Sequence, residues 1–484
     1  MMDALSDDSA AYFVELHEYP VEEVAARLKA EEAEVRKAIA GLAAQGLATT
    51  RSRPNPAANK PSTLVTFSFV GVASYKEHVL RCLPKFFEQD ECSEAALEQV
   101  IRAIFKQRSS DISPDSQHEE NLDSMQGAMD EAVFFVADYL QNGEYPANPV
   151  VRESGELGDI DWDRTIGEKT PWLIGESLVY LDPVHTYVEA DDSDFCQSLH
   201  LAIVSDCFRF LKSTGIAEAI GIGSWPPSET KLVDFGSPSY VLAKLRSEKQ
   251  VQFDDRRLRL LNLMEKHLER SISLRSFDDF GFFGTEHFEI VWETLCAHAF
   301  DNQRDMPIAR CLPNAVLPER AQHLTTNSTM KDLIGRPTWS IYDGPIAFEQ
   351  ESAGKLNPDV VTIHYEKGAC LAILDAKYYT LSISGHTVAN QPGVEDIVKQ
   401  HAYQMALQDF ARVNNLQMQN ALLFPTGGRT RIAGSVHYDV LSDFANKKLI
   451  PIAVVFVNMS DIIDFYLTGS APWKAVAQEI LTQL

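Results

Sequence analysis

The sequence predicts an α/β protein (α+β overall) whose C-terminal part is a mixed sheet flanked by helices. Two apolar, β-branched runs, Val360–Tyr365 and Ala369–Leu374, enclose a turn that contains Gly368. Such a pattern is typical of a β-hairpin. Apolar residues at helical spacing precede the hairpin in Thr285–Phe300 and follow it in Val394–Asn415. We therefore expect a buried hairpin between two helices.

Charged residues stand at one end of this predicted hairpin. Asp359 precedes the first strand, and Asp375-Ala376-Lys377 closes the second. Because side chains alternate along a strand, Asp375 and Lys377 point to the same face. The two aspartates and the carbonyl of Ala376 offer the oxygen ligands that Mg²⁺ prefers, with Mn²⁺ as a substitute. A surface hairpin with solvated charges is the alternative. We favour metal-assisted phosphodiester hydrolysis, because the charged residues end an apolar strand.

The flanking helices carry further candidates for this site. Glu289 and Glu293 are four residues apart and share a helix face, so either could complete a metal site. Periodicity alone does not choose between them. The second helix presents Lys399, Gln400, Tyr403 and Gln404, and a solvated helix face is the alternative, above all for Lys399 and Gln404.

The first 75 residues predict a winged helix-turn-helix. Helices are expected at 21–28 and 31–45, and wing strands at 47–50 and 62–69. Arg51, Arg53 and Lys60 lie in the wing, and no acidic residue occurs between Leu47 and Tyr75. A local positive stripe of this kind favours contact with DNA phosphates, although a winged helix can also serve protein contact alone.

The remaining segments carry fewer signals of chemistry. Helices are predicted at Cys82–Phe105 and Tyr240–Lys266, and strands at Ala421–Phe424, Val436–Val440 and Pro451–Val457. The middle region has no phosphate-binding loop and no dinucleotide fingerprint, so we expect a scaffold that binds a partner. In the Gly-rich turn at 426–431, Arg429 and Arg431 either contact phosphate or are solvated in an ordinary hairpin turn.

Composition limits the location and partners of the chain. Its 484 residues are 45% hydrophobic and 23% charged, and no apolar run is long enough to cross a membrane. We expect a cytoplasmic protein whose seven widely spaced cysteines stay reduced. The formal net charge of −26 argues against a generally basic surface. DNA contact would therefore need a local positive patch or a partner.

Asp359, Asp375 and Lys377, with Glu293 ahead and Gln400 behind, resemble the core of PD-(D/E)xK nucleases. Further landmarks resemble the LlaJI-type restriction endonucleases, which are relatives of the McrC subunit of McrBC systems. These landmarks are Phe69–Val72, Cys82–Lys85, Gly158–Trp162 with Thr165-Ile166, Phe283–Thr285, Trp292-Glu293 and Lys399–Gln404. The resemblance implies that Glu293 rather than Glu289 is the acid of the first helix, and it adds Gln400 to the catalytic residues.

The resemblance also implies a function. It predicts a Mg²⁺-dependent endonuclease for double-stranded DNA, the cleavage subunit of a McrBC/LlaJI-like restriction (phage-defence) system. The expected partner is a McrB-like AAA+ GTPase, with the chain forming a homodimer or assembling on the ring. The expected domains are a winged helix-turn-helix at 1–75, a partner-binding middle domain at 76–270 and a nuclease domain at 271–484. The alternatives are a catalytically silent DNA-binding adaptor and an RNA-directed nuclease.

Overall fold

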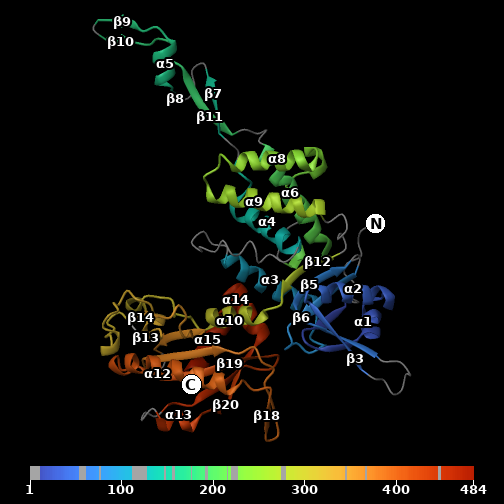
Figure 1. The fold of residues 1–484 in the computed structure, drawn as a ribbon, viewed down its shortest axis with the longest axis vertical. Coiled ribbons are helices and arrows are strands. Elements are labelled where there is room, and N and C mark those ends of the chain that lie inside the picture. Colours follow the sequence, from blue (N-terminus) through green and yellow to red (C-terminus); the bar gives the residue numbers. More distant parts are fainter. Residues whose placement is uncertain are drawn as a thin grey trace. The chain divides into compact units, whose positions relative to one another are not determined.

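The chain divides into two compact units in the computed structural model (Figure 1), which describes residues 11–53, 62–75, 78–111, 128–146, 149–154, 159–175, 177–190, 195–214, 216–219, 227–273, 280–343, 346–365, 368–444 and 449–484. The first unit joins Met1–Asn121 to Phe282–Leu484, and the second is Leu122–Gly281. The second unit is thus inserted in the sequence of the first. The division into three predicted domains stays a prediction.

Two helices and three strands form the N-terminal segment of the first unit. Helices α1 (Val21–Leu28) and α2 (Glu32–Ala44) are followed by strands β3 (Ala48–Arg53) and β4 (Ser62–Phe67), which pair with β2 (Glu18–Pro20) in the order β2-β4-β3. Lys29 ends α1 in the left-handed conformation, which allows the sharp turn into α2. Both predicted helices and both predicted strands are present, with small shifts at their ends.

A second sheet joins the beginning of the chain to residues far along it. Its order is β1-β6-β5-β12, from β1 (Tyr12–Val14), β6 (His78–Leu83), β5 (Val70–Tyr75) and β12 (Phe280–Thr285). The helix predicted at Cys82–Phe105 is wrong at its start, because Cys82 and Leu83 end β6 and helix α3 spans Glu94–Asp111. Pro84 explains the difference, since a residue before proline is disfavoured in a helix.

Strands β5 and β12 approach each other at two glycines. A Cβ atom on Gly71 would lie 2.2 Å from the carbonyl oxygen of Phe283, and one on Gly284 would lie 2.2 Å from that of Val70. Gly71 also has a φ of 135°, which side chains rarely tolerate. This sheet therefore requires glycine at both positions.

A five-stranded mixed sheet forms the centre of the C-terminal part, in the order β15-β16-β19-β21-β20. Strands β15 and β16 are antiparallel, β16, β19 and β21 are parallel, and β20 returns antiparallel to β21. These strands are β15 (Val360–His364), β16 (Cys370–Ala376), β19 (Gln417–Thr426), β20 (Arg431–Val436) and β21 (Ile452–Asn458).

Helices cover both faces of this sheet. Gln419 and Asn420 are neighbours in β19 and so point to opposite faces. Gln419 donates to the carbonyl of Leu481 in α15, whereas Asn420 accepts from Gln400 in α12. The covering helices are α10 (Phe288–Ala299), α12 (Val394–Val413), α14 (Met459–Thr468) and α15 (Ala471–Gln483). The helix predicted at Thr285–Phe300 begins later than expected, because Thr285 ends β12 and His287 takes the cap position.

Shorter elements complete the first unit. The strand predicted at Val436–Val440 is wrong, because β20 ends at Val436 and a helix begins at Asp439, an acidic residue suited to a helix start. The shorter elements are α11 (Ile308–Cys311), two 3₁₀ turns (Glu319–Ala321 and Met330–Ile334), β13 (Thr338–Asp343), β14 (Ile346–Glu351), β17 (Ser382–Ser384), β18 (Thr387–Ala389) and α13 (Asp439–Phe444).

The second unit pairs its longer helices, α4 (Ala128–Asn142) on α6 (Phe195–Thr214) and α8 (Pro238–Lys249) on α9 (Asp255–Ser273). The single helix predicted at Tyr240–Lys266 is therefore wrong. Asp254 interrupts it, because its side chain accepts from the N–H of Arg257 at 2.8 Å and caps α9. The remaining elements are β7 (Pro149–Ser154), β8 (Asp159–Ile160), α5 (Trp162–Glu168), β9 (Trp172–Ile174), β10 (Ser177–Val179), β11 (His185–Ala190), α7 (Ile216–Ala219) and a 3₁₀ turn (Leu232–Phe235).

Within the described ranges, no helix combines the length and apolar character needed to cross a membrane. All seven cysteines are among the described residues, and all except Cys92 are buried.

We predict that Gly71→Ala destabilises the protein by roughly 3 kcal/mol, because the new Cβ would force β5 away from β12. Gly354→Ala is the matched control, since its Cβ would meet nothing within 4 Å. Thermal unfolding of the two variants checks this. Equal unfolding temperatures would show that the two strands can separate without cost.

Candidate active site

The hairpin β15–β16 places Asp359 and Asp375 at the same end of the sheet. Val360 pairs with Leu374. Asp359 directly precedes Val360 and Asp375 directly follows Leu374, so the two aspartates come at the same end of the hairpin. Asp359 Oδ2 accepts a hydrogen bond from the backbone N–H of Ala376 at 2.7 Å. The buried, apolar strands fix this arrangement, and the joint role of the two aspartates stays a prediction.

Two side chains hold the turn that carries Asp359. Arg304 Nη1 donates to the carbonyl of Pro358 at 3.0 Å, and the hydroxyl of Tyr403 donates to that of Asn357 at 2.9 Å. Both hydrogen bonds fix the backbone of the two residues that precede Asp359. Neither of these contacts was predicted from the sequence, because a contact across 46 or 54 positions leaves no local pattern.

Lys377 lies between two carboxylates. Its Nζ is 2.7 Å from Asp375 Oδ2 and 2.9 Å from Asp396 Oδ1. Burial by itself would lower the pKa of Lys377, but the two aspartates outweigh this effect and raise that pKa. The lysine is therefore held in its charged form.

Burial and mutual repulsion act on the acidic groups. Burial, with Asp375 and then Glu293 nearby, raises the pKa of Asp359 to about 7. Burial, and next Asp375, also raises the pKa of Glu293. The three carboxyl groups thus gather more negative charge than Lys377 balances, which is the condition for attracting a cation.

The two candidate acids of α10 have different surroundings. Glu293 is partly buried and feels the charge of Asp375. Glu289 has a side chain that is 46% exposed and contacts His287 at 2.9 Å. This geometry favours Glu293 as the residue that faces the acidic cluster, and its role stays a prediction.

The oxygen donors near the hairpin are of the kind that suits a hard divalent cation. They are the carboxylates of Asp359, Asp375 and Glu293, with the Ala376 carbonyl next to them in sequence. Among the described residues, no three His, Cys, Asp or Glu side chains are already grouped as a metal site. Movement of side chains or bound water would have to complete the coordination.

Gln400 faces the sheet. Its Nε2 lies within hydrogen-bonding distance of the Asn420 side chain at 2.7 Å and of the carbonyls of Ile373 and Ala421, both at 3.3 Å. The side chain is fully buried. These contacts tie α12 to β16 and β19, and the proposed catalytic role of Gln400 stays a prediction.

Tyr378 connects the active-site strand to the N-terminal segment. Its hydroxyl donates to Glu15 at 2.7 Å, and Lys85 Nζ lies 4.1 Å above its ring. The ring also packs edge-on against Phe86. Burial raises the pKa of Glu15. The residue after Lys377 is thus fixed by groups from the first 90 residues.

The predicted DNA-binding residues lie in separate places. Arg51 and Arg53 are exposed on β3, and Lys60 lies outside the described residues. Arg429 and Arg431 flank the turn between β19 and β20, where the Arg431 guanidinium lies 4.6 Å from the ring centre of Phe456. They are not part of the acidic cluster.

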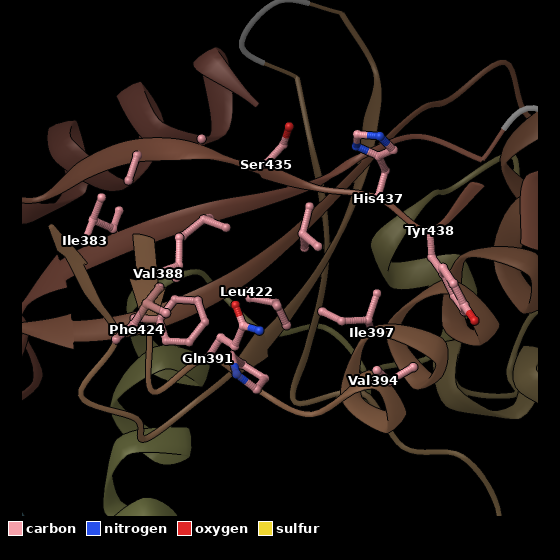
Figure 2. A pocket seen from close by; sticks show the side chains of 16 residues that line it. Ile383, Val388, Gln391, Val394, Ile397, Leu422, Phe424, Ser435, His437 and Tyr438 are labelled. Atoms are coloured by element: carbon pink, nitrogen blue, oxygen red, sulfur yellow. The ribbon is translucent and has the colours of Figure 1, made fainter. Parts of the chain in front are cut away.

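An apolar cavity of about 550 Å³ lies on the α12 side of the sheet (Figure 2). Ile383 and Val388 of the β17–β18 hairpin, Val394 of α12 and Phe424 of β19 contribute to its lining. Leu422, also in the lining, is the cross-strand neighbour of Asp375. The cavity therefore adjoins the strand that carries the acidic cluster.

Known proteins resemble this chain in sequence and in structure. The type II restriction enzyme BsuMI component YdjA of Bacillus subtilis (strain 168) is 26% identical over 417 residues, which cover 83% of this chain and 80% of that protein. McrC bound to McrB AAA+ hexamers of Thermococcus gammatolerans gives a TM-score of 0.42 at 14% identity, over 98% of this chain and 99% of that one. A second structure of the Thermococcus gammatolerans McrBC complex gives a TM-score of 0.21 at 16% identity, over 56% and 87%.

The sequence also matches a protein family over most of its length. Residues 69–309 and 322–467 match the LlaJI restriction endonucleases. These ranges include both aspartates of the hairpin, Lys377, and the helices on either side. The chain belongs to the LlaJI restriction endonuclease family.

Proposed function

We propose that this protein is a Mg²⁺-dependent DNA endonuclease with a PD-(D/E)xK site, the cleavage subunit of a McrBC/LlaJI-like restriction system. The observation that carries the proposal is the meeting of Asp359, Asp375 and Lys377 at one end of the β15–β16 hairpin. Membership of a restriction endonuclease family supports it.

In this proposal Asp359, Asp375, Glu293 and the carbonyl of Ala376 hold Mg²⁺, or Mn²⁺ in its place. The bound ion supplies a polarised phosphoryl oxygen and a more acidic water. Burial and then the repulsion between carboxylates raise the pKa values of Asp359 and Glu293, and a bound cation would relieve that repulsion, which supports this assignment.

Lys377 is proposed to orient the attacking water and to stabilise negative charge on the phosphoryl oxygens. Its contacts with two carboxylates keep it protonated, so it acts as a fixed positive charge and not as a base. In the reaction the water oxygen bonds to phosphorus and the bond from phosphorus to one ester oxygen breaks. The water's proton passes to solvent, and the leaving oxygen gains one.

The N-terminal segment is proposed to be a winged helix-turn-helix that contacts double-stranded DNA. The order β2-β4-β3 with α1 and α2 supports this fold. Arg51 and Arg53 on the exposed strand β3, with Lys60, would contact phosphates. Glu32 and Glu34 in the first turn of α2 disfavour base reading by that end of the helix.

The second unit is proposed to bind a McrB-like AAA+ GTPase. The chain has no Walker motif of its own, and its Bacillus subtilis relative is named as a component of a restriction enzyme. The β9–β10 hairpin exposes Trp172, Leu173, Ile174 and Leu178, each at least 59% accessible. A concentration of exposed apolar side chains marks an interaction site. Assembly on the ring, or as a homodimer, would follow from this contact.

We predict that Asp375→Asn and Lys377→Met each lower DNA cleavage by about 10²-fold or more, because each removes charge needed in the transition state. Lys474→Met, an exposed position on α15, is the control for loss of a lysine. Cleavage of plasmid DNA in Mg²⁺, with the partner present, checks this. Full activity of either active-site variant, with the control also active, would contradict the site assignment.

A pH dependence follows from Asp359. Its pKa of about 7 exceeds that of the unfolded chain, so the folded, metal-free protein binds this proton more tightly. The resulting stabilisation is complete below about pH 4 and is lost as the pH rises through about 7. Asp359→Asn should therefore gain stability relative to wild type between about pH 5 and pH 8.

Unfolding temperatures in EDTA across this range measure the effect. Mg²⁺ should restore wild-type stability at the alkaline end, because the bound ion favours the ionised carboxylate. A difference between variant and wild type that does not change with pH would argue against a raised pKa.

Cleavage should also depend on the partner. We predict that Trp172→Asp with Leu173→Asp abolishes stimulation by the NTPase and GTP, since charge on the hairpin would oppose burial. Val233→Asp, another exposed apolar position of the second unit, should leave stimulation intact. The measurement is the rate of duplex DNA cleavage by each variant, with and without the partner and GTP. Rapid, nucleotide-independent digestion by the chain alone would show a self-sufficient nuclease.

A further inference from the structure

Asp396 contacts Lys377 at the acidic cluster from a helix outside the hairpin. It lies in the first turn of α12, where its own N–H donates to the carbonyl of Gly393 at 3.1 Å. Its Oδ1 is 2.9 Å from Lys377 Nζ, on a side chain that is 23% exposed. The lysine side chain is only 12% exposed, so the ion pair is partly shielded from water.

The contact matters because Asp375 binds Lys377 and, in the proposed function, also the metal ion. Its Oδ2 is bonded to Lys377 at 2.7 Å, yet in the proposed function the same carboxylate binds Mg²⁺. An ammonium group and a divalent cation repel each other, so they compete for one small carboxylate. A second anion is needed to hold the lysine when the metal binds.

Asp396 is placed to meet this need. It belongs to α12 and not to the hairpin, so the metal site does not require it to move with Asp375. It contacts the same Nζ atom as Asp375, which allows Lys377 to stay in position after its bond to Asp375 weakens. Neighbouring Glu395 is exposed and faces a different direction on the helix.

We propose that Asp396 is a positioning residue that holds Lys377 while Asp375 binds the metal ion, an inference that rests on the proposed nuclease function. Without Asp396, Asp375 is the carboxylate left in direct contact with the Lys377 ammonium group. Lys377 then competes with the metal for that carboxylate. Asp396 acts through the lysine and does not touch the metal.

A double-mutant cycle separates this role from direct metal binding. Mg²⁺ affinity is measured on the full-length protein without DNA, by calorimetric titration and by the rise in unfolding temperature. Four proteins are compared: wild type, Asp396→Asn, Lys377→Met and the double variant. Glu395→Gln is the matched control, because it removes one negative charge from the adjacent position of the same helix turn.

Asp396→Asn should weaken Mg²⁺ binding by about five- to tenfold, and Glu395→Gln by no more than about twofold. In the Lys377→Met background, Asp396→Asn should change the affinity by less than about twofold, because the competing lysine is gone. In cleavage assays with the partner present, Asp396→Asn at saturating Mg²⁺ should lower kcat and leave KM for DNA unchanged. Asp396→Glu should recover part of the lost kcat.

Three results would overturn the proposal. Equal loss of Mg²⁺ affinity in both backgrounds would make Asp396 a metal ligand or a general source of charge. Unchanged affinity and kcat in Asp396→Asn would show that Lys377 needs no second anion. If wild type binds no Mg²⁺ at all, the nuclease proposal fails and this inference fails with it, a result distinct from the other two.

Discussion

The charge gathered at one end of the β15–β16 hairpin constrains much of the first unit. Burial and then the nearby charge of Asp375 raise the pKa values of Asp359 and Glu293. Carboxylates in such a place are costly unless positive charge and hydrogen bonds compensate them. Lys377 and the Ala376 N–H provide part of that compensation. Helix α10 adds Glu293 to this cluster, and helix α12 adds Asp396.

The hairpin itself was predictable from the sequence. Its strands are continuous apolar runs. The alternation of side chains along a strand places Asp375 and Lys377 on one face, and this argument needs no knowledge of contacts with distant residues. Helix α12 was predictable for the same reason, since Tyr403, Leu407 and Phe410 recur at helical spacing and are buried. The helices predicted from local periodicity were wrong where a single residue interrupts a helix, as Pro84 and Asp254 do.

Contacts between distant parts of the chain could not be predicted in this way. Asp396 follows Gly393 as an ordinary first-turn acid of a helix, and only the structure brings it to Lys377. The requirement for glycine at position 71 arises from the backbone of residue 283. Glu15 meets Tyr378 across 363 positions. Such pairs depend on the completed fold, and a single sequence carries no record of them.

The joint between the two ends of the insertion has a mechanical consequence. Arg108 at the end of α3 donates to the carbonyl of Gly284 in β12, and its guanidinium lies 5.5 Å from the Phe283 ring centre. The chain leaves the first unit after α3 and returns through β12, so both connections to residues 122–281 begin at elements that are fastened to each other. Tension on the inserted unit would load this fastening before it reached the strands that carry Asp359 and Asp375.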